Sequence, residues 1–420
     1  MSTSAGQDDS AVTRESNAVV EVAVTGLFGK FDHTLALGDD RKCLILIGAN
    51  GVGKTVILRM LYELFTVNGD LRVFRRYPFR SFRVTLADHT VVAVTPSGPH
   101  RLELALMQPG SPTMSTLVAM LPLPGEWTEG GLEDTDKSTL DFIDLMRRGE
   151  DDAMLWLKRV RDSTRVRLIE TDRAMTGKGR TASDPVHRCA DDLAQQLARA
   201  ATDYAAHAQA LDRTFPQRFI EGAYAVASRA DLPARLDAVL AGFDRMQRIG
   251  LLAGADSPVP VLALELIGLD EHMIRFLSLY ADDARQKLEP TNDFAERVEL
   301  FIQQVHGWLD DKTVTITPRQ GFAIDDKITR DRIPFAGLSS GERHLLVMWH
   351  ELLFCTPRGA LVLIDEPEIS WHVSWQKRFL DDLLQVSAVV GFTTIIATHS
   401  PFIPGEHLDL ICPMERPESP

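Results

Sequence analysis

The 420-residue sequence predicts an α/β fold in which buried parallel strands alternate with helices. Three short apolar runs support this prediction, because each is followed by polar residues of the kind that bind phosphate or metal. The runs are Cys43–Ile47, Ala360–Ile364 and Thr393–Thr398. Such runs are typical of strands that are covered on both faces. The polar residues after them should therefore meet beyond the carboxyl ends of the strands.

The first run leads into a phosphate-binding loop. Residues 48–55 fit the pattern G-x-x-x-x-G-K-[ST], and apolar residues then recur at helical spacing from Val56 to Phe65. The loop should thus lie between a strand and a helix N-terminus, with its amides directed at phosphate. We expect Lys54 to reach the β and γ phosphates of ATP and Thr55 to bind Mg²⁺. The residues expected to contact nucleotide here are Gly48, Asn50, Gly51, Gly53, Lys54 and Thr55.

The other two runs are followed by two carboxylates and a histidine. Asp365 is expected to hold Mg²⁺ through water, and Glu366 to orient and deprotonate the attacking water. His399 is expected to donate a hydrogen bond to the γ-phosphate. An acidic pair at a strand end is often only a solvated turn, so this interpretation depends on the phosphate loop in the same chain. The predicted catalytic residues are Glu366, His399 and Lys54, and the predicted metal ligands are Thr55 and Asp365.

A further motif, Leu338-Ser339-Ser340-Gly341-Glu342-Arg343, precedes an apolar helical stretch. It resembles the signature of ABC-type ATPases, in the LSSGE form of SMC, RecF and OLD-like proteins. Three other stretches are similar to the stand-alone OLD-like group, also labelled AAA or AbiEii-like ATPases, several of which belong to anti-phage systems such as Septu, PARIS and some retrons. These stretches are residues 77–82, 211–218 and 364–376. The similarity runs from about residue 19 to 411, although the family usually has Leu where Trp371 stands.

The resemblance implies an ABC-type head with a mixed central sheet, and a helical insertion between the phosphate loop and the signature. It also implies a homodimer or higher homo-oligomer, in which the signature caps the ATP of the partner copy. The signature residues expected to contact nucleotide are Ser339, Ser340, Gly341 and Glu342. A plain helix N-cap is the alternative interpretation of this motif. The metal-contacting Q-loop that the resemblance implies stays undecided between Gln108 and the stretch Glu170-Thr171-Asp172-Arg173.

Composition limits the other possibilities. The net charge of −14 argues against bulk attraction to nucleic acid. The four cysteines lack paired metal spacing, so reduced thiols are expected. No apolar run approaches the ~18 residues needed to span a bilayer, and Met1–Asn17 lacks the apolar core of a signal peptide. These observations predict a cytoplasmic protein without membrane contact.

Two groups of basic residues are candidates for DNA contact. The first group, Arg72, Arg75, Arg76, Arg80 and Arg83, alternates with Phe74, Tyr77, Phe79 and Phe82. The second group is Arg147, Arg148, Lys158, Arg159, Arg161, Arg165 and Arg167. Solvated faces or salt bridges to neighbouring acids are the alternative interpretation.

The motifs divide the chain into five expected segments. They are a disordered tail at 1–18, a first ATPase lobe at 19–110, a mainly helical insertion at 111–310, a second lobe at 311–411 and a tail at 412–420. Pro109–Pro124 indicates a linker after the first lobe. Within the insertion, the spacing of apolar residues from Leu193 to Leu211 predicts one helix that is too short for an SMC-type arm.

The leading functional hypothesis is an ATP-gated sensor for a separately encoded effector, expected to be a nuclease, in anti-phage defence. OLD proteins continue after this point into a Toprim nuclease domain, whereas the present sequence ends soon after His399, so we expect no nuclease activity of its own. A phage protein is a candidate trigger. The alternatives are a RecF- or SMC-like DNA-binding ATPase and, with less support, a nucleotide-binding subunit of a transporter.

Overall fold

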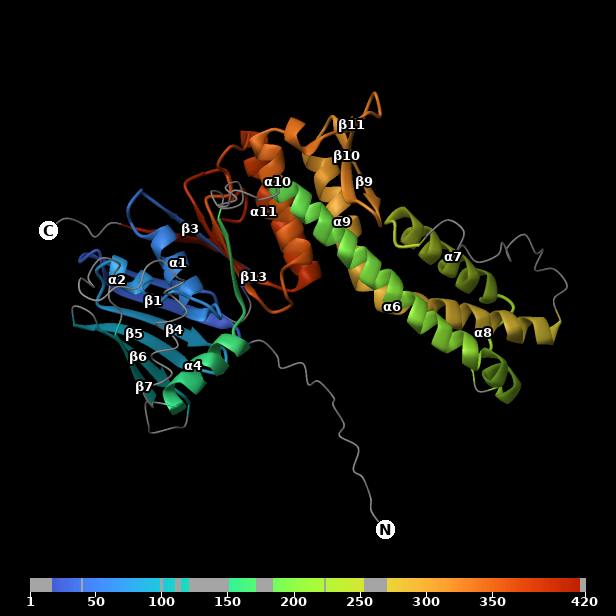
Figure 1. Cartoon of the computed structure of the whole chain (residues 1–420), viewed down its shortest axis with the longest axis horizontal. Coiled ribbons are helices and arrows are strands. Elements are labelled where there is room, and N and C mark those ends of the chain that lie inside the picture. The colour runs from blue at the N-terminus through green and yellow to red at the C-terminus, as the bar shows by residue number, and fades with distance from the viewer. Residues whose placement is uncertain are drawn as a thin grey trace, which may run out of the picture. The chain divides into compact units, whose positions relative to one another are not determined.

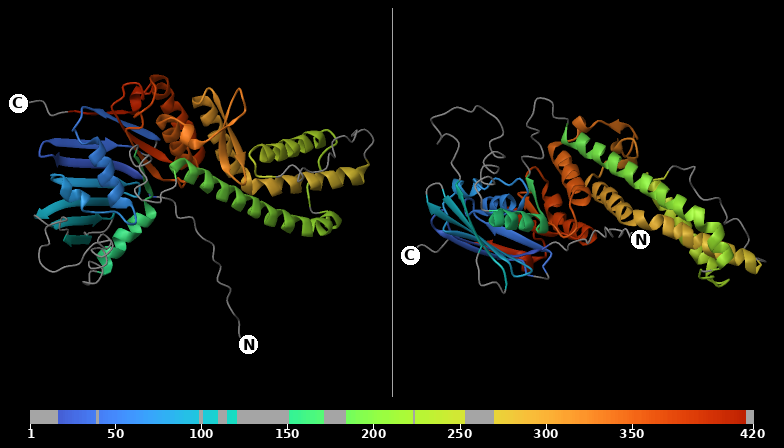
Figure 2. Two further views of the ribbon diagram at one scale, coloured as in Figure 1. Left: turned by 45° about the horizontal axis from the view of Figure 1, so that its top comes forward. Right: turned by 60° about the horizontal axis from the view of Figure 1, so that its bottom comes forward.

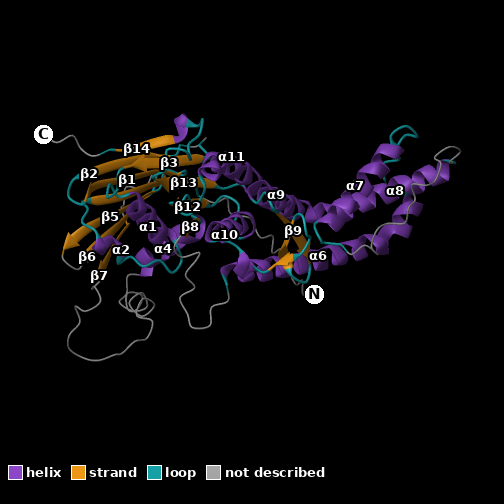
Figure 3. Cartoon of the chain, turned by 90° about the horizontal axis from the view of Figure 1, so that it is seen from above, coloured by secondary structure: helices purple, strands orange, loops and turns teal. Residues whose placement is uncertain are grey.

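The computed structural model describes residues 17–38, 41–98, 101–109, 115–120, 151–170, 184–222, 224–252 and 270–415. The chain forms two compact units. One comprises residues 1–171 and 356–420, and the other comprises residues 172–355. The second unit begins and ends later than the helical segment expected at 111–310, and it includes the signature. Figure 3 shows most strands in the first unit and mostly helices in the second.

The first unit contains a six-stranded antiparallel sheet with the order β2-β1-β4-β5-β6-β7 (Figure 1). Its strands are β1 (Val19–Leu27), β2 (Phe31–Ala36), β4 (Ser81–Leu86), β5 (Val91–Gly98), β6 (Arg101–Met107) and β7 (Ser115–Met120). The interpretation of Pro109–Pro124 as a linker is wrong where β7 lies, because Ser115–Met120 pairs antiparallel with β6. The Pro and Ser residues of this stretch indicate a loop, whereas the strand is defined by its hydrogen-bonded pairing with β6.

The same unit contains a five-stranded sheet with the order β14-β3-β13-β12-β8, in which every pair of neighbours is parallel. Its strands are β3 (Cys43–Gly48), β8 (Val166–Glu170), β12 (Leu361–Asp365), β13 (Thr393–Thr398) and β14 (Ile411–Met414). In the register, Asp365 lies opposite both Glu170 and Ala397, and Thr398 lies opposite Ile47. The carboxyl ends of β3, β12 and β13 are therefore level at one edge, as the sequence predicts.

One hydrophobic core joins the two sheets of this unit. It combines apolar residues of the antiparallel sheet with α1 (Lys54–Phe65), α2 (Val73–Arg76), α4 (Asp151–Ser163) and residues such as Leu363 and Ile395 of the parallel sheet. The two views of Figure 2 show α1 beside these strands. A further helix, α11 (Val373–Val390), links β12 to β13, and η5 (Leu408–Leu410) precedes β14. The phosphate loop thus lies between a strand of the parallel sheet and a helix whose apolar residues are buried in this core.

The second unit is mainly helical. Its helices are α6 (Pro185–Glu221), α7 (Leu232–Arg248), α8 (Glu271–Leu288), η3 (Glu289–Thr291), α9 (Asn292–Trp308), η4 (Phe335–Gly337) and α10 (Ser340–Phe354). A small antiparallel sheet of β9 (Lys312–Thr317), β10 (Gly321–Asp326) and β11 (Arg332–Ile333) leads into the signature. β9 and β10 pair as an antiparallel hairpin shortly before the signature.

The helix expected from Leu193 to Leu211 is considerably longer in the structure. α6 has 37 residues, about 55 Å at 1.5 Å per residue, and Pro216 lies within it. Its buried residues all precede Ala198. Partly buried residues continue at helical spacing through Leu211, Phe215 and Phe219, so the repeat extends beyond the predicted end and past Pro216.

The N-terminal tail, the cysteines and the membrane prediction can also be compared with the structure. The expected tail at 1–18 lies almost wholly outside the described residues, since these begin at Asn17. All four cysteines are free thiols. Among the helices that the structure describes, none is long and apolar enough to cross a membrane.

Candidate functional site

The phosphate loop connects β3 to α1, and its glycines are required by its geometry. Gly53 is the N-cap of α1 with φ 106°, and a Cβ there would lie 2.3 Å from Leu27 Cδ2. A Cβ on Gly48 would lie 2.5 Å from the carbonyl oxygen of Met414. Only glycine meets both the left-handed backbone at residue 53 and the close approach of neighbouring atoms.

Lys54 lies in the first turn of α1 and is buried, with 5% of its surface exposed. Its Nζ donates hydrogen bonds to the carbonyl oxygens of Gly48 (2.8 Å) and Ala49 (3.4 Å), and it lies 3.4 Å from Nδ1 of His399. Burial lowers the pKa of Lys54, and the nearby carboxylate of Glu366 opposes this effect. The ammonium group thus folds back across the loop, where a phosphate oxygen could replace a carbonyl.

Asp365 at the end of β12 meets Thr55 of α1. The Thr55 hydroxyl donates a 2.9 Å hydrogen bond to Asp365 Oδ1. Burial raises the pKa of Asp365 to about 6; the bond from Thr55 and the Arg59 guanidinium oppose the rise, and the carboxylates of Glu366 and Glu170 add to it. This pair of oxygen donors is suited to Mg²⁺, which prefers hard oxygen ligands.

Glu366 and His399 face each other from adjacent strand ends. His399 Nε2 lies 3.4 Å from Glu366 Oε1, and the Glu366 amide donates to the carbonyl of Ala397 at 2.8 Å. Glu366 has φ 49°, a left-handed conformation that is uncommon for a residue with a side chain. Backbone strain of this kind is concentrated at functional sites.

These residues line one cavity of about 460 Å³ within the first unit. Its lining residues are Phe28, Asn50, Gly51, Gly53, Lys54, Thr55, Val56, Glu366 and His399. The structure thus brings together most of the predicted first-unit site residues, with Asp365 directly bonded to Thr55 and Gly48 bonded to Lys54.

The signature residues lie in the second unit and do not line this cavity. Ser339 is the N-cap of α10 and forms a capping box with Glu342: its hydroxyl accepts from the Glu342 amide, and Glu342 Oε2 accepts from the Ser339 amide at 2.7 Å. Lys312 of β9 binds the other Glu342 oxygen at 2.9 Å. Ser339 and Ser340 are exposed, whereas Gly341 is buried.

The structure adds a residue that the motifs do not predict. Oε1 of Glu368 accepts hydrogen bonds from the Thr398 hydroxyl (2.7 Å) and from the amides of His399 (2.7 Å) and Ser400 (3.1 Å). Its only sequence signal is its place two residues after Glu366. This carboxylate fixes the backbone that presents His399 to the cavity.

Two further contacts support the loop and the acidic edge. His33 of β2 donates from Nε2 to the carbonyl of Val52 at 2.9 Å, and burial lowers its pKa. Glu170 is buried at the end of β8 and pairs with Arg59 at 2.9 Å. It is the member of its stretch that lies beside Asp365, whereas Asp172 lies outside the described residues and Gln108 is an exposed residue just after β6.

The structure removes several residues from the two basic groups considered for DNA contact. Phe74, Phe79 and Phe82 lie in the core, so they cannot stack on bases beside the first group of arginines. Arg161 is also buried, with three hydrogen bonds to carbonyls at the end of α1, which removes it from the second group. Arg147 and Arg148 lie outside the described residues. Trp371 is buried with its ring centroid 5.0 Å from that of Phe379.

Part of the chain matches a known protein family. Residues 256–403 match a protein-family model described as "AAA domain, putative AbiEii toxin, Type IV TA system". This segment contains the signature, Asp365, Glu366 and His399, but not the phosphate loop. No curated protein matches the sequence significantly.

Solved structures of SMC head domains are also similar to the chain. An Smc head domain with an extended coiled coil, bound to the C-terminal domain of ScpA, from Pyrococcus furiosus is 12% identical, with a TM-score of 0.37, covering 95% of this chain and 94% of that one. The SMC head domain from Thermotoga maritima is 12% identical, with a TM-score of 0.37 and 94% coverage of both chains. An SmcHead bound to the C-winged helix domain of ScpA is 11% identical, with a TM-score of 0.36, covering 92% and 90%.

The phosphate loop at a strand–helix junction and the carboxylates after β12 are the parts of a P-loop ATPase site, and the matched AAA-domain family covers the segment that contains the carboxylates. The predicted resemblance to AbiEii-like ATPases and the predicted α/β fold are thereby confirmed.

Proposed function

We propose that the protein binds and hydrolyses ATP with Mg²⁺ in the 460 Å³ cavity of the first unit. The observation that carries this proposal is the convergence of Lys54, Thr55, Asp365, Glu366 and His399 from three parallel strand ends, with a direct bond between Thr55 and Asp365. Phosphoryl transfer depends mainly on positioning and on charge stabilisation, and these side chains provide both.

The donor set fits a magnesium ion. The Thr55 hydroxyl and the Asp365 carboxylate are hard oxygen ligands held 2.9 Å apart, and they would hold the ion together with phosphate oxygens. When bound, Mg²⁺ would supply charge neutralisation on the phosphates. Lys54 adds a buried positive charge at the loop.

Glu366 is the proposed base for the attacking water, and His399 the proposed partner of the γ-phosphate. The 3.4 Å contacts of His399 to both Lys54 and Glu366 place its ring between the cation and the base. The hydrogen bond from the His399 amide to the Glu368 carboxylate holds it there.

Substitution of Glu366 tests the catalytic part of the proposal. Glu366→Gln should retain ATP affinity and lose turnover by at least about 100-fold, since a positioned base contributes that much. Lys54→Ala should lose ATP binding. The matched control is Glu406→Gln, at an exposed acid in the same unit, which should leave both measurements unchanged. Turnover by Glu366→Gln at the wild-type rate would contradict the assignment.

We further propose that ATP joins two copies through the signature. Support comes from the exposed hydroxyl of Ser339 at the N-terminus of the 15-residue α10, a position suited to anions, and from the resemblance to ABC-type ATPases. Glu366→Gln with saturating ATP should form a dimer by light scattering. Ser339→Arg should remain monomeric while still binding ATP, and Ser228→Arg, at an exposed serine before α7, should still dimerise. A monomer of Glu366→Gln under saturating ATP would contradict this part.

The biological role that we propose is control of a separately encoded effector, expected to be a nuclease, in anti-phage defence. The resemblance to stand-alone OLD-like ATPases and the description of the matched family as a putative toxin of a Type IV TA system support this role. The protein encoded next to this one should copurify with it and become toxic when a phage protein is present, in a manner lost in Lys54→Ala.

A DNA-maintenance role predicts a different result. Arg76, Arg80 and Arg83 are exposed, so a RecF- or SMC-like ATPase would show ATP-dependent duplex binding that charge reversal at these three positions abolishes. Such binding without any effect on a copurifying partner would favour this alternative.

A further inference from the structure

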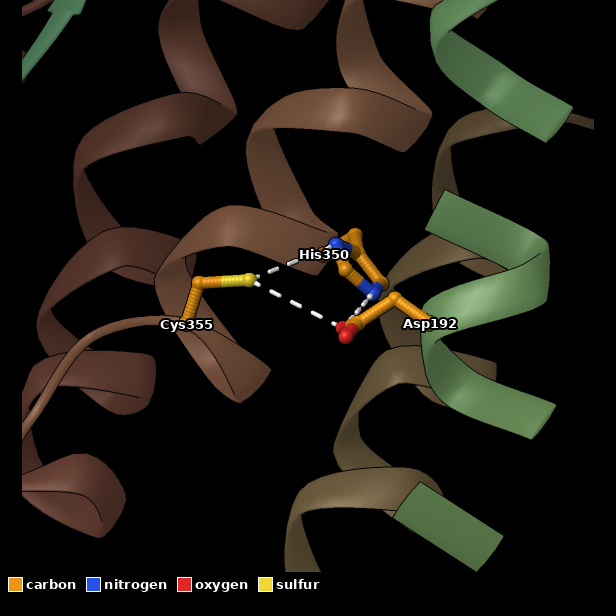
Figure 4. Close-up of side chains that lie close together, drawn as sticks. All are labelled: Asp192, His350 and Cys355. Carbon is orange, nitrogen blue, oxygen red and sulfur yellow. Dashed lines mark hydrogen bonds and ion pairs between the residues drawn. The ribbon is translucent and has the colours of Figure 1, made fainter. Parts of the chain in front are cut away.

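Three potential metal ligands meet in the second unit, outside the nucleotide cavity (Figure 4). Asp192 extends from α6, His350 lies near the end of α10, and Cys355 is the C-cap of that helix. Asp192 Oδ2 lies 3.1 Å from His350 Nε2 and 3.9 Å from Cys355 Sγ, and Sγ lies 3.8 Å from His350 Nδ1. When one ligand atom is taken from each residue, the three atoms all lie within 4.8 Å of one another.

We propose that Asp192, His350 and Cys355 bind a divalent transition-metal ion of the zinc type. Thiolate, imidazole and carboxylate are the ligands that Zn²⁺ takes in proteins, and three protein ligands with a fourth open position form a known class of zinc site. Two tetrahedral ligands on one zinc, a sulfur and an oxygen, are separated by about 3.6 Å if the bond lengths are near 2.3 and 2.1 Å. The observed separation of Cys355 Sγ and Asp192 Oδ2, 3.9 Å, is close to this value.

The local electrostatics favour a cation at this position. The carbonyl end of a helix carries a partial negative charge, which Arg297 of α9 partly offsets by donating to the Leu353 carbonyl at 3.2 Å. The Asp192 carboxylate, and the thiolate that Cys355 would form on binding a metal, would supply the negative charge that a divalent cation needs.

The same arrangement could also be interpreted as a nucleophilic Cys-His-Asp triad, but the helix end argues against it. A reactive thiolate needs a positive environment, such as a helix N-terminus or a cationic neighbour. Cys355 lies instead at a helix C-terminus, where a thiolate without a metal is disfavoured. A bound cation removes this conflict.

Access and position are both suitable for an ion. The Asp192 side chain is 44% exposed, so the cluster opens to solvent on that side, whereas the His350 side chain is 3% exposed. α6 and α10 are also linked by an ion pair of Asp184 with Arg343 near the starts of both helices. The ion would add a second link, at the far end of the helix that begins at the signature.

Metal content of the purified full chain tests the proposal. After EDTA treatment, incubation with ZnCl₂ without nucleotide, and desalting, the wild type should retain about one zinc per chain by mass spectrometry, consistent with a three-residue site. Cys355→Ser and Asp192→Asn should lose this zinc. The matched controls should retain it: Cys412→Ser removes a half-buried thiol in the other unit, and Asp381→Asn removes an acid that is paired with a histidine but with no thiol.

Cobalt provides a second measurement. Co²⁺ should produce a thiolate charge-transfer band in the wild type and in both controls, and no such band in Cys355→Ser. Asp192 is half-exposed, so Asp192→Asn should remain folded by circular dichroism, which separates metal loss from unfolding. Equal zinc retention by wild type and Cys355→Ser, or the absence of both zinc and the cobalt band in the folded wild type, would overturn the proposal. Loss of zinc from Asp365→Asn but not from Cys355→Ser would place the ion at the nucleotide site and overturn it as well.

Discussion

Asp365→Asn should stabilise the nucleotide-free protein while it abolishes the response to Mg-ATP. The folded state raises the pKa of this carboxyl to about 6, mainly by burial, whereas the ordinary value of an aspartate is about 3.9. The folded protein therefore binds this proton more tightly than the unfolded chain does. Between these two pKa values, the free energy of unfolding falls as the pH rises, and above pH 6 the full cost of the charged form is present.

The magnitude follows from the size of the shift. Two pKa units correspond to about 3 kcal/mol, and partial exposure of the Asp365 side chain reduces this to about 1.5 kcal/mol. Asn is uncharged and keeps an oxygen that can accept the hydrogen bond from Thr55. For units of 150–250 residues, 1 kcal/mol changes Tm by about 2–4 °C, so Tm should rise by about 3–6 °C at pH 8.

The assay compares thermal and urea unfolding of wild type and Asp365→Asn from pH 8 to pH 5, with and without Mg-ATP. The gain of the variant should shrink below pH 6, and Mg-ATP should raise the Tm of the wild type only. Asp381→Asn, at an exposed carboxylate in the same unit, should change Tm little at any pH. A lower Tm for Asp365→Asn at pH 8, or a gain that does not depend on pH, would refute the reasoning.

Three other substitutions test the residues that support the site. Gly53→Ala should lose ATP binding and lower Tm, since the new Cβ would lie 2.3 Å from Leu27. The control Gly29→Ala, with open space around it, should lower the free energy of unfolding by only about 1 kcal/mol, and equal effects of the two variants on nucleotide binding and Tm would contradict this. Arg161→Met should lower the free energy of unfolding by about 3 kcal/mol, because it leaves three carbonyls at the end of α1 without their donor, and KM for ATP should not change; an unchanged urea midpoint would count against it. Glu368→Ala should reduce turnover more than ATP affinity, and Glu368→Gln should restore it, since one oxygen accepts all three bonds; equal activities of the two variants would be inconsistent with that positioning role.

Local motifs account for the parts of the site that could be predicted from sequence. Lys54 and Thr55 belong to a short pattern whose backbone shape depends on nearby glycines, and Asp365 and His399 end apolar runs that are long enough to be recognised as strands. Parallel strands bring their carboxyl ends to one edge, so the meeting of these residues follows from the strand prediction.

Contacts between segments far apart in the chain could not be predicted from such local motifs. Arg161 resembles any basic residue of a solvated helix, and only packing against α1 shows that its guanidinium binds the end of that helix. Likewise, β7 is defined by its pairing with β6.

The sequence by itself determined the phosphate loop and three buried strands that end in polar residues, because each depends on residues that are adjacent in the chain. Only the tertiary structure decided that Glu368 holds His399, that Glu170 lies beside Asp365, and that Asp192 meets His350 and Cys355. The physical reason is that these contacts join segments far apart in the chain, and their energies depend on burial and distance, which no spacing along the chain records.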